Sequence, residues 1–191
     1  MAANKVLFLD IDGVLNSQRD MYDEKKVKKK KNNGWTLEDN LDARNLFWVG
    51  LFCRLTKVKV VMSSSWRGLW DKGMKTNDRV LGPTKKLRRW GIKIEDRTSL
   101  GLSKLKKEHP YDKSLVGSYT SKCNRGYYRG TQILEYIEKH NLSFQDILIF
   151  DDDICDIICY SELKPRIVQS YFYKNGFGLK QFKKAMKLMR G

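Results

Sequence analysis

Two aspartates near the start of the chain, Asp10 and Asp12, have a spacing that suits group transfer. They are two residues apart, directly after the apolar residues 5–9 and before Gly13. One carboxylate can therefore attack a bound group while the other moves a proton. A carboxylate is a known covalent nucleophile, and an aspartyl-phosphate intermediate divides the hydrolysis of a phosphate ester into two easier steps. The alternative is a tight turn without chemistry, since Asp and Gly favour turns.

A second acidic group, Asp151 to Asp153, directly follows the apolar residues 147–150. Carboxylates that converge repel one another unless a cation binds them, and a set of oxygen ligands suits Mg²⁺. Such an ion, with a positioned base, stabilises the in-line transfer of a phosphoryl group. The expected metal ligands are Asp10, Asp12, Asp151 and Asp152.

The elements that must position these side chains alternate along the chain. Short apolar stretches predict strands over residues 5–9, 58–62, 91–94, 147–150 and 166–168. Amphipathic stretches predict helices over residues 42–57, 79–90, 130–140 and 178–190. This alternation predicts an α/β fold, a doubly wound parallel sheet with helices on both faces. Ligands of such sheets bind at the carboxyl ends of the strands, where Asp10, the serines 63–65 and the aspartates 151–153 should converge.

One domain is expected over residues 1–191, because the chain has no internal repeat and no linker rich in Pro and Gly. Two basic stretches, near residues 17–40 and 98–128, interrupt the apolar pattern and are interpreted as insertions. The longest apolar runs are far shorter than the ~18 residues of a membrane helix, and the chain start lacks the apolar stretch of a signal peptide. We therefore expect an intracellular, cytoplasmic protein without membrane contact.

The charge indicates the class of partner. The chain has 38 Lys and Arg against 22 Asp and Glu, a formal net charge of +16. Such a protein attracts polyanions, and nucleic acids are the commonest in the cell. Arg67 could bind a phosphate with two hydrogen bonds. Lys122 and Arg125 lie among tyrosines, a combination that can follow a backbone while bases stack on the rings.

The motif residues resemble the haloacid dehalogenase (HAD) superfamily of phosphotransferases. Residues 8–14 (FLDIDGV) are similar to its hhhDxDG signature. The resemblance implies that Asp10 is the nucleophile and Asp12 the general acid and base, and the second aspartate indicates a phosphate ester as substrate. Residues 60–67 (VVMSSSWR) resemble the second motif, whose hydroxyl binds a phosphoryl oxygen. We assign this role to Ser64, with Ser63 and Ser65 as the alternatives.

The third and fourth motifs also have counterparts. The superfamily has a Lys or Arg at the start of a helix, which offsets the charge of the phosphoaspartate; Arg129 fits best and Lys122 is the alternative. The fourth motif resembles the Asp-Asp variant, through Asp151 and Asp152, with Asp153 and Asp156 as substitutes. Within the superfamily, roughly residues 4 to 185 are similar to the HAD modules of RNA repair proteins. They resemble the 3′-phosphatase half of polynucleotide kinase-phosphatases more distantly.

The resemblance and the charge together predict a Mg²⁺-dependent phosphatase that removes a terminal phosphate from a nucleic acid. A 3′-phosphate fits best, although RNA versus DNA and the choice of end stay open. The insertions are short for HAD caps, which favours an open site able to admit a polymer end. The alternatives are a phosphatase of free nucleotides or other small phosphoesters, and a non-catalytic nucleic-acid-binding protein on a HAD scaffold.

Overall fold

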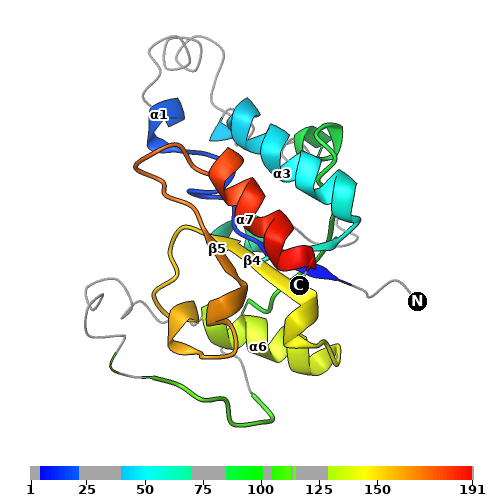
Figure 1. Cartoon of the computed structure of the whole chain (residues 1–191), viewed down its shortest axis with the longest axis vertical. Helices are drawn as coiled ribbons and strands as arrows, with labels where there is room; N and C mark the ends of the chain where they lie inside the picture. Colours follow the sequence, from blue (N-terminus) through cyan, green and yellow to red (C-terminus); the bar gives the residue numbers. More distant parts are fainter. Residues whose placement is uncertain are drawn as a thin grey trace.

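A computed structural model of the chain describes residues 5–21, 40–69, 85–100, 105–112, 114 and 129–190. A five-stranded, all-parallel sheet lies at its centre, with helices on both faces (Figure 1). The strands are β1 (Val6–Leu9), β2 (Lys59–Met62), β3 (Ile94–Arg97), β4 (Ile147–Asp151) and β5 (Ile167–Gln169), and their order across the sheet is β3-β2-β1-β4-β5. The predicted fold class is therefore confirmed.

Four labelled α-helices accompany the sheet. They are α1 (Gln18–Met21), α3 (Ala43–Thr56), α6 (Arg129–Lys139) and α7 (Leu179–Arg190). Residues 85–89 are also helical. Short 3₁₀ turns are η2 (Ser65–Leu69), η4 (Phe144–Asp146), η5 (Ile157–Cys159) and η6 (Lys164–Arg166). Within the described parts of the chain, every helix is too short or too polar to cross a membrane.

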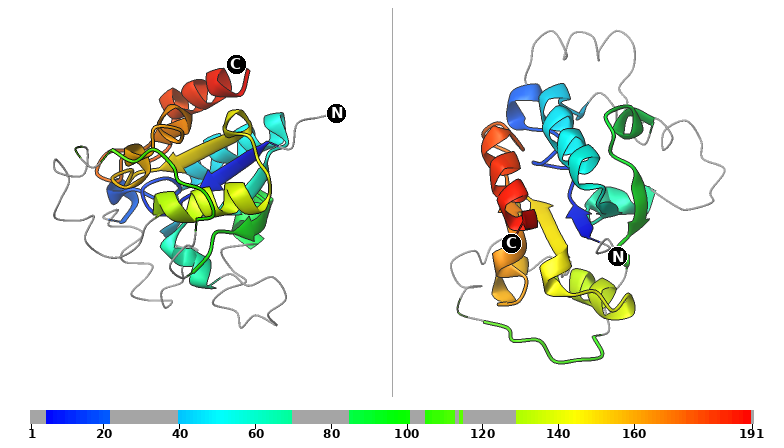
Figure 2. Two further views of the ribbon diagram at one scale, coloured as in Figure 1. Left: turned by 90° about the horizontal axis from the view of Figure 1, so that it is seen from below. Right: turned by 45° about the vertical axis from the view of Figure 1, so that its right-hand side comes forward.

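Both faces of the sheet are buried, which explains why the central strands consist of uninterrupted apolar residues. Successive residues of a strand point to opposite faces. Leu7 and Leu9 pack in the core beneath α3, whereas Val6 and Phe8 pack in the core beneath α6. Helix α7 lies beside α3, and Figure 2 shows α7 and α6 on opposite sides of the sheet.

The register brings three strand ends to one level. Leu9 of β1 is paired with Met62 of β2 on one side and with Phe150 of β4 on the other. The backbone N–H of Asp10 donates to the Phe150 carbonyl at 2.9 Å, and that of Ser63 donates to the Leu9 carbonyl at 2.9 Å. The residues that follow these three neighbouring strands therefore share the carboxyl edge of the sheet, as the sequence predicts.

The strand expected over residues 91–94 is wrong in position, since β3 spans Ile94–Arg97. Gly91 has φ +86° and ends the helix at residues 85–89, with the N–H of Ile92 donating to the Leu87 carbonyl at 2.9 Å. Gly91 is thus the left-handed residue after a helix. The sequence pattern misses β3 because this edge strand carries polar residues at its carboxyl end.

Most of the two predicted insertions lies outside the described residues, Lys122 and Arg125 included. The described part of the second stretch, residues 98–100, 105–112 and 114, contains one isolated bridge from Tyr111 to Tyr160. His109 attaches this part to the body of the protein through Glu162 at 2.7 Å and Glu138 at 3.2 Å.

Candidate active site

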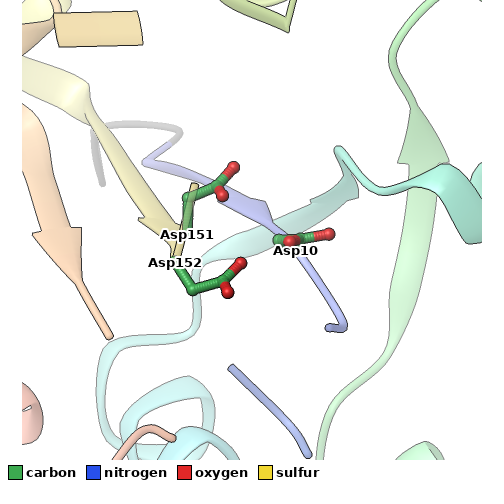
Figure 3. Close-up of side chains that lie close together, drawn as sticks. All are labelled: Asp10, Asp151 and Asp152. Carbon is green, nitrogen blue, oxygen red and sulfur yellow. The ribbon is translucent and has the colours of Figure 1, made fainter. Parts of the chain in front are cut away.

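Three carboxylates meet at the carboxyl edge of the sheet: Asp10 after β1, Asp151 at the end of β4, and Asp152 beside it (Figure 3). One oxygen of each lies within 4.8 Å of the others. Asp10 and Asp151 are buried, whereas Asp152 is half-buried. Two neighbouring parallel strands therefore supply the whole cluster.

Gly13 makes room for this cluster. Its φ of +71° suits glycine, and a Cβ atom at this position would lie 2.1 Å from Cγ of Asp152. A side chain here would displace Asp152 or the turn after Asp12. The glycine of the DxDG sequence thus permits the close approach of the first and fourth motifs.

Arg129, the first residue of α6, lies between two of the carboxylates. Its Nη1 is 3.1 Å from Oδ2 of Asp10 and 2.5 Å from Oδ2 of Asp151. The start of α6 is fixed by Asp156, whose carboxylate accepts a hydrogen bond from the Gly130 N–H at 2.7 Å. Asp156 therefore positions Arg129, and it lies outside the three-carboxylate cluster.

Burial makes this cluster difficult to ionise. Desolvation raises the pKa of Asp10 and, more strongly, that of Asp151, although the charge of Arg129 opposes both shifts. Desolvation and the nearby charge of Asp10 raise the pKa of Asp152 to about 7. The single positive charge of Arg129 is thus too small to keep three carboxylates ionised. A further cation bound between them would favour their ionised forms.

The cluster fits a divalent cation. Three carboxylates offer oxygen ligands, which suit a hard metal ion. Oδ1 of Asp10 is buried and has no well-oriented hydrogen-bond partner in the described part of the chain. Asp153, the alternative ligand, is exposed and outside the cluster, and its backbone N–H donates to Asp151 at 3.0 Å.

Asp12 stands apart from the three carboxylates. Its Oδ2 accepts a hydrogen bond from Nε1 of Trp66 at 3.0 Å, and its Oδ1 accepts one from Nδ2 of Asn16 at 2.8 Å. The expected fourth carboxylate ligand is therefore not part of the cluster. Asp12 instead lines a cavity beside it, together with Asp152. The sequence did not indicate Asn16 and Trp66 as partners of Asp12, although Trp66 lies within the second motif and Asn16 only two residues after the first.

The three serines after β2 have different environments. Ser64 is fully buried, and its side chain lies beside Asp10 and lowers the pKa of that carboxyl. Ser63 is also buried but belongs to the ladder with β1, and Ser65 is exposed at the start of η2. The surroundings of Ser64 are thus those expected of the motif serine.

Arg67, predicted as a phosphate ligand, makes its hydrogen bonds inside the protein. It is buried, and its guanidinium donates to the Ser64 carbonyl at 2.7 Å, the Ser99 carbonyl at 3.0 Å and Oε1 of Gln132 at 2.9 Å. All three nitrogens are therefore engaged inside the protein. Arg67 thus positions Ser64, and its role as a phosphate ligand stays a prediction.

Comparison with models of known families gives a match over residues 6–177, to the family described as HAD domain in Swiss Army Knife RNA repair proteins. The matched range includes the cluster, Arg129, Ser64 and Asp12. No curated protein matches the chain.

Proposed function

Because the chain belongs to the family of HAD domains in Swiss Army Knife RNA repair proteins, we propose that it is a Mg²⁺-dependent phosphatase of nucleic-acid ends. The proposed substrate is a terminal phosphate, with the 3′-phosphate favoured. The observation that carries the proposal is the cluster of Asp10, Asp151 and Asp152 with Arg129 beside it. We also propose that residues 1–191 form one domain and that the protein acts in the cytoplasm.

In the proposed mechanism, a carboxylate oxygen of Asp10 attacks phosphorus and forms an aspartyl-phosphate. The bond from phosphorus to the terminal sugar oxygen breaks, and Asp12 protonates that oxygen. Asp12 then takes a proton from water, which attacks phosphorus and releases inorganic phosphate and free Asp10. Trp66 and Asn16 hold Asp12 in place for both transfers.

Two cationic groups would offset the charge of the phosphoryl oxygens. Mg²⁺ would be held by Asp10, Asp151 and Asp152, and it would neutralise charge on the transferring phosphoryl group. Arg129 supplies a fixed positive charge at the same place, and Ser64 adds a hydroxyl donor beside Asp10.

The charge distribution supports a nucleic acid as substrate. The net charge of +16 is accompanied by exposed lysines along α7, namely Lys180, Lys183, Lys184 and Lys187. Lys183 and Lys184 lie three and four residues after Lys180, and Lys187 lies four and three residues after them, so all of them share one face of the helix. Helix α7 starts after the loop that follows β5, at the same edge as the carboxylates.

The test is phosphate release with Mg²⁺ from matched oligonucleotides that carry a 3′- or a 5′-phosphate, as RNA and as DNA, with a 3′-mononucleotide alongside. We expect release chiefly from one oligonucleotide end, loss of release with EDTA, and a decrease of about 10³-fold or more in Asp10→Asn. Asp112→Asn is the matched control, because Asp112 is exposed and lies outside both the cluster and the cavity beside it.

The same assay separates the alternatives. Turnover of the mononucleotide alone would favour a phosphatase of small phosphoesters. Binding of oligonucleotides without any release of phosphate would favour a non-catalytic protein on this scaffold. Equal activity of Asp10→Asn and the wild-type protein would overturn the proposed nucleophile.

A further inference from the structure

A cavity of about 750 Å³ opens directly beside the carboxylate cluster. This volume is within the range of small-molecule sites in proteins. Asp12 and Asp152 form one side of it, and the loop after β5 forms the other, through Tyr171, Tyr173 and Lys174. If a phosphate is bound at Asp10, the group attached to that phosphate can occupy this cavity.

The loop presents two tyrosine rings to solvent. Tyr171 is 45% exposed and Tyr173 is 73% exposed. The backbone that carries them is nevertheless fixed at both ends of the loop. The Phe172 carbonyl accepts from the Gln18 N–H at 2.9 Å, and the Phe177 N–H donates to the Val14 carbonyl at 3.1 Å. Exposed aromatic rings on an anchored backbone lose little conformational entropy when they bind a flat partner.

Each of the two tyrosine rings also contacts a neighbouring side chain of the same loop. Nζ of Lys174 lies 5.0 Å from the centroid of the Tyr171 ring, and the Tyr173 ring packs edge-on against Phe172 with centroids 5.4 Å apart. These contacts leave a large part of each tyrosine uncovered while limiting its rotation. Lys174 adds a positive charge at the same loop.

The charges of the lining select a neutral group. Three acids line the cavity, Asp12, Asp152 and Asp153, against one basic residue, Lys174. A second phosphate inside this cavity would meet repulsion, whereas an uncharged aromatic base would meet tyrosine rings. The acids also offer acceptors for sugar hydroxyl groups.

We propose that this cavity is the subsite for the terminal nucleoside of the substrate, whose base stacks on Tyr171 and Tyr173. The proposal rests on the proposed function, because it takes the phosphate of that nucleoside to lie at Asp10. The subsite thereby distinguishes a nucleic-acid end from a simple phosphate ester.

The first test compares two substrates: an oligonucleotide with a terminal phosphate, and p-nitrophenyl phosphate, which has no nucleoside. The readout is the ratio of the two kcat/KM values. Since stacking of a base on an aromatic ring contributes roughly 1–3 kcal/mol, we expect Tyr171→Ala/Tyr173→Ala to lower this ratio about 10-fold or more. Tyr171→Phe/Tyr173→Phe retains both rings and should retain the ratio. Tyr111→Ala, at an exposed tyrosine elsewhere, is the control.

The second test does not depend on catalysis. Binding of adenosine 3′-monophosphate to the Asp10→Asn protein is measured by equilibrium dialysis, with and without the double alanine change. We expect the alanine pair to weaken binding about 10-fold and the phenylalanine pair to leave it within about 2-fold. If no oligonucleotide releases phosphate, the proposed function fails, and this measurement alone decides the subsite. An unchanged affinity or an unchanged kcat/KM ratio in the alanine pair would overturn the subsite.

Discussion

At the scale of single residues, the cluster shows what a sequence motif can and cannot reveal. Asp10, Asp151 and Asp152 could be predicted to converge because each follows a buried parallel strand. The partners of Asp12 could not, because Trp66 is 54 positions away in the chain and only the folded turn brings it to 3.0 Å. The burial that raises each pKa is likewise a property of the assembled site.

The raised pKa of Asp152 predicts that Mg²⁺ affinity depends on pH. Metal binding requires the ionised carboxylate, and a pKa of about 7 leaves this group mostly protonated at pH 6 and mostly ionised at pH 8. The dissociation constant for Mg²⁺ should therefore be about 10-fold higher at pH 6 than at pH 8, measured by isothermal titration calorimetry. The raised pKa values of Asp10 and Asp151 act in the same direction.

The comparison variant for this experiment is Asp152→Asn. It should bind Mg²⁺ more weakly at both pH values and lose the part of the pH dependence that Asp152 contributes. A wild-type affinity that is equal at pH 6 and pH 8 would contradict the assigned ligand.

At the scale of elements, the apolar strands could be predicted, because a strand that is buried on both faces of a sheet consists of consecutive apolar residues. The predicted strand 147–150 corresponds to β4, and the predicted helix 178–190 to α7. Strand β3 was displaced in the prediction because Gly91 and Ile92 look like the start of a strand while serving to end a helix. The internal contacts of Arg67 could not be predicted, because Ser99 and Gln132 are distant from it in the chain.

Arg67 joins three elements, and its removal should cost stability. Its guanidinium connects the end of β2 at Ser64, the segment after β3 at Ser99 and helix α6 at Gln132. Arg67→Ala would leave these acceptors without their donor in a buried place. We expect the free energy of unfolding to fall by about 2–4 kcal/mol, measured by urea denaturation.

Two further variants make this measurement specific. Arg67→Lys should recover only part of the loss, because one ammonium group cannot reproduce the planar arrangement of three donor nitrogens. Arg88→Ala, at an exposed arginine, should change stability by less than about 0.5 kcal/mol. A change of that small size in Arg67→Ala would show that the three contacts contribute little.

At the scale of the whole molecule, the net charge and the local charge of the candidate site have opposite signs. The chain is strongly basic, yet most of the charged residues that line the cavity beside Asp10 are acids. The overall charge attracts a polyanion, and the local acids then restrict what enters. Composition predicted the first property, whereas the second depends on which loops the fold places around the site.

The exposed lysines of α7 predict a salt-dependent affinity for single-stranded oligonucleotides. Each lysine that contacts a phosphate contributes about 0.7 to the slope of log K against log salt concentration. Lys180→Gln/Lys184→Gln should therefore reduce the slope by up to about 1.4, measured by fluorescence anisotropy. Lys93→Gln/Lys139→Gln removes the same charge just before β3 and at the end of α6, and it should change the slope much less. Equal effects of the two pairs would show that the protein attracts the oligonucleotide without a preferred binding path along α7.

One contact at the opposite edge of the sheet has a topological consequence. Nζ of Lys5, just before β1, donates to the Met189 carbonyl near the end of α7 at 2.6 Å. The first strand and the last described helix are thus held together where the strands begin, at the edge of the sheet opposite to the carboxylate cluster. The strand that leads to Asp10 is therefore closed at its start by α7, so the reactive edge and this closure lie at opposite ends of one strand.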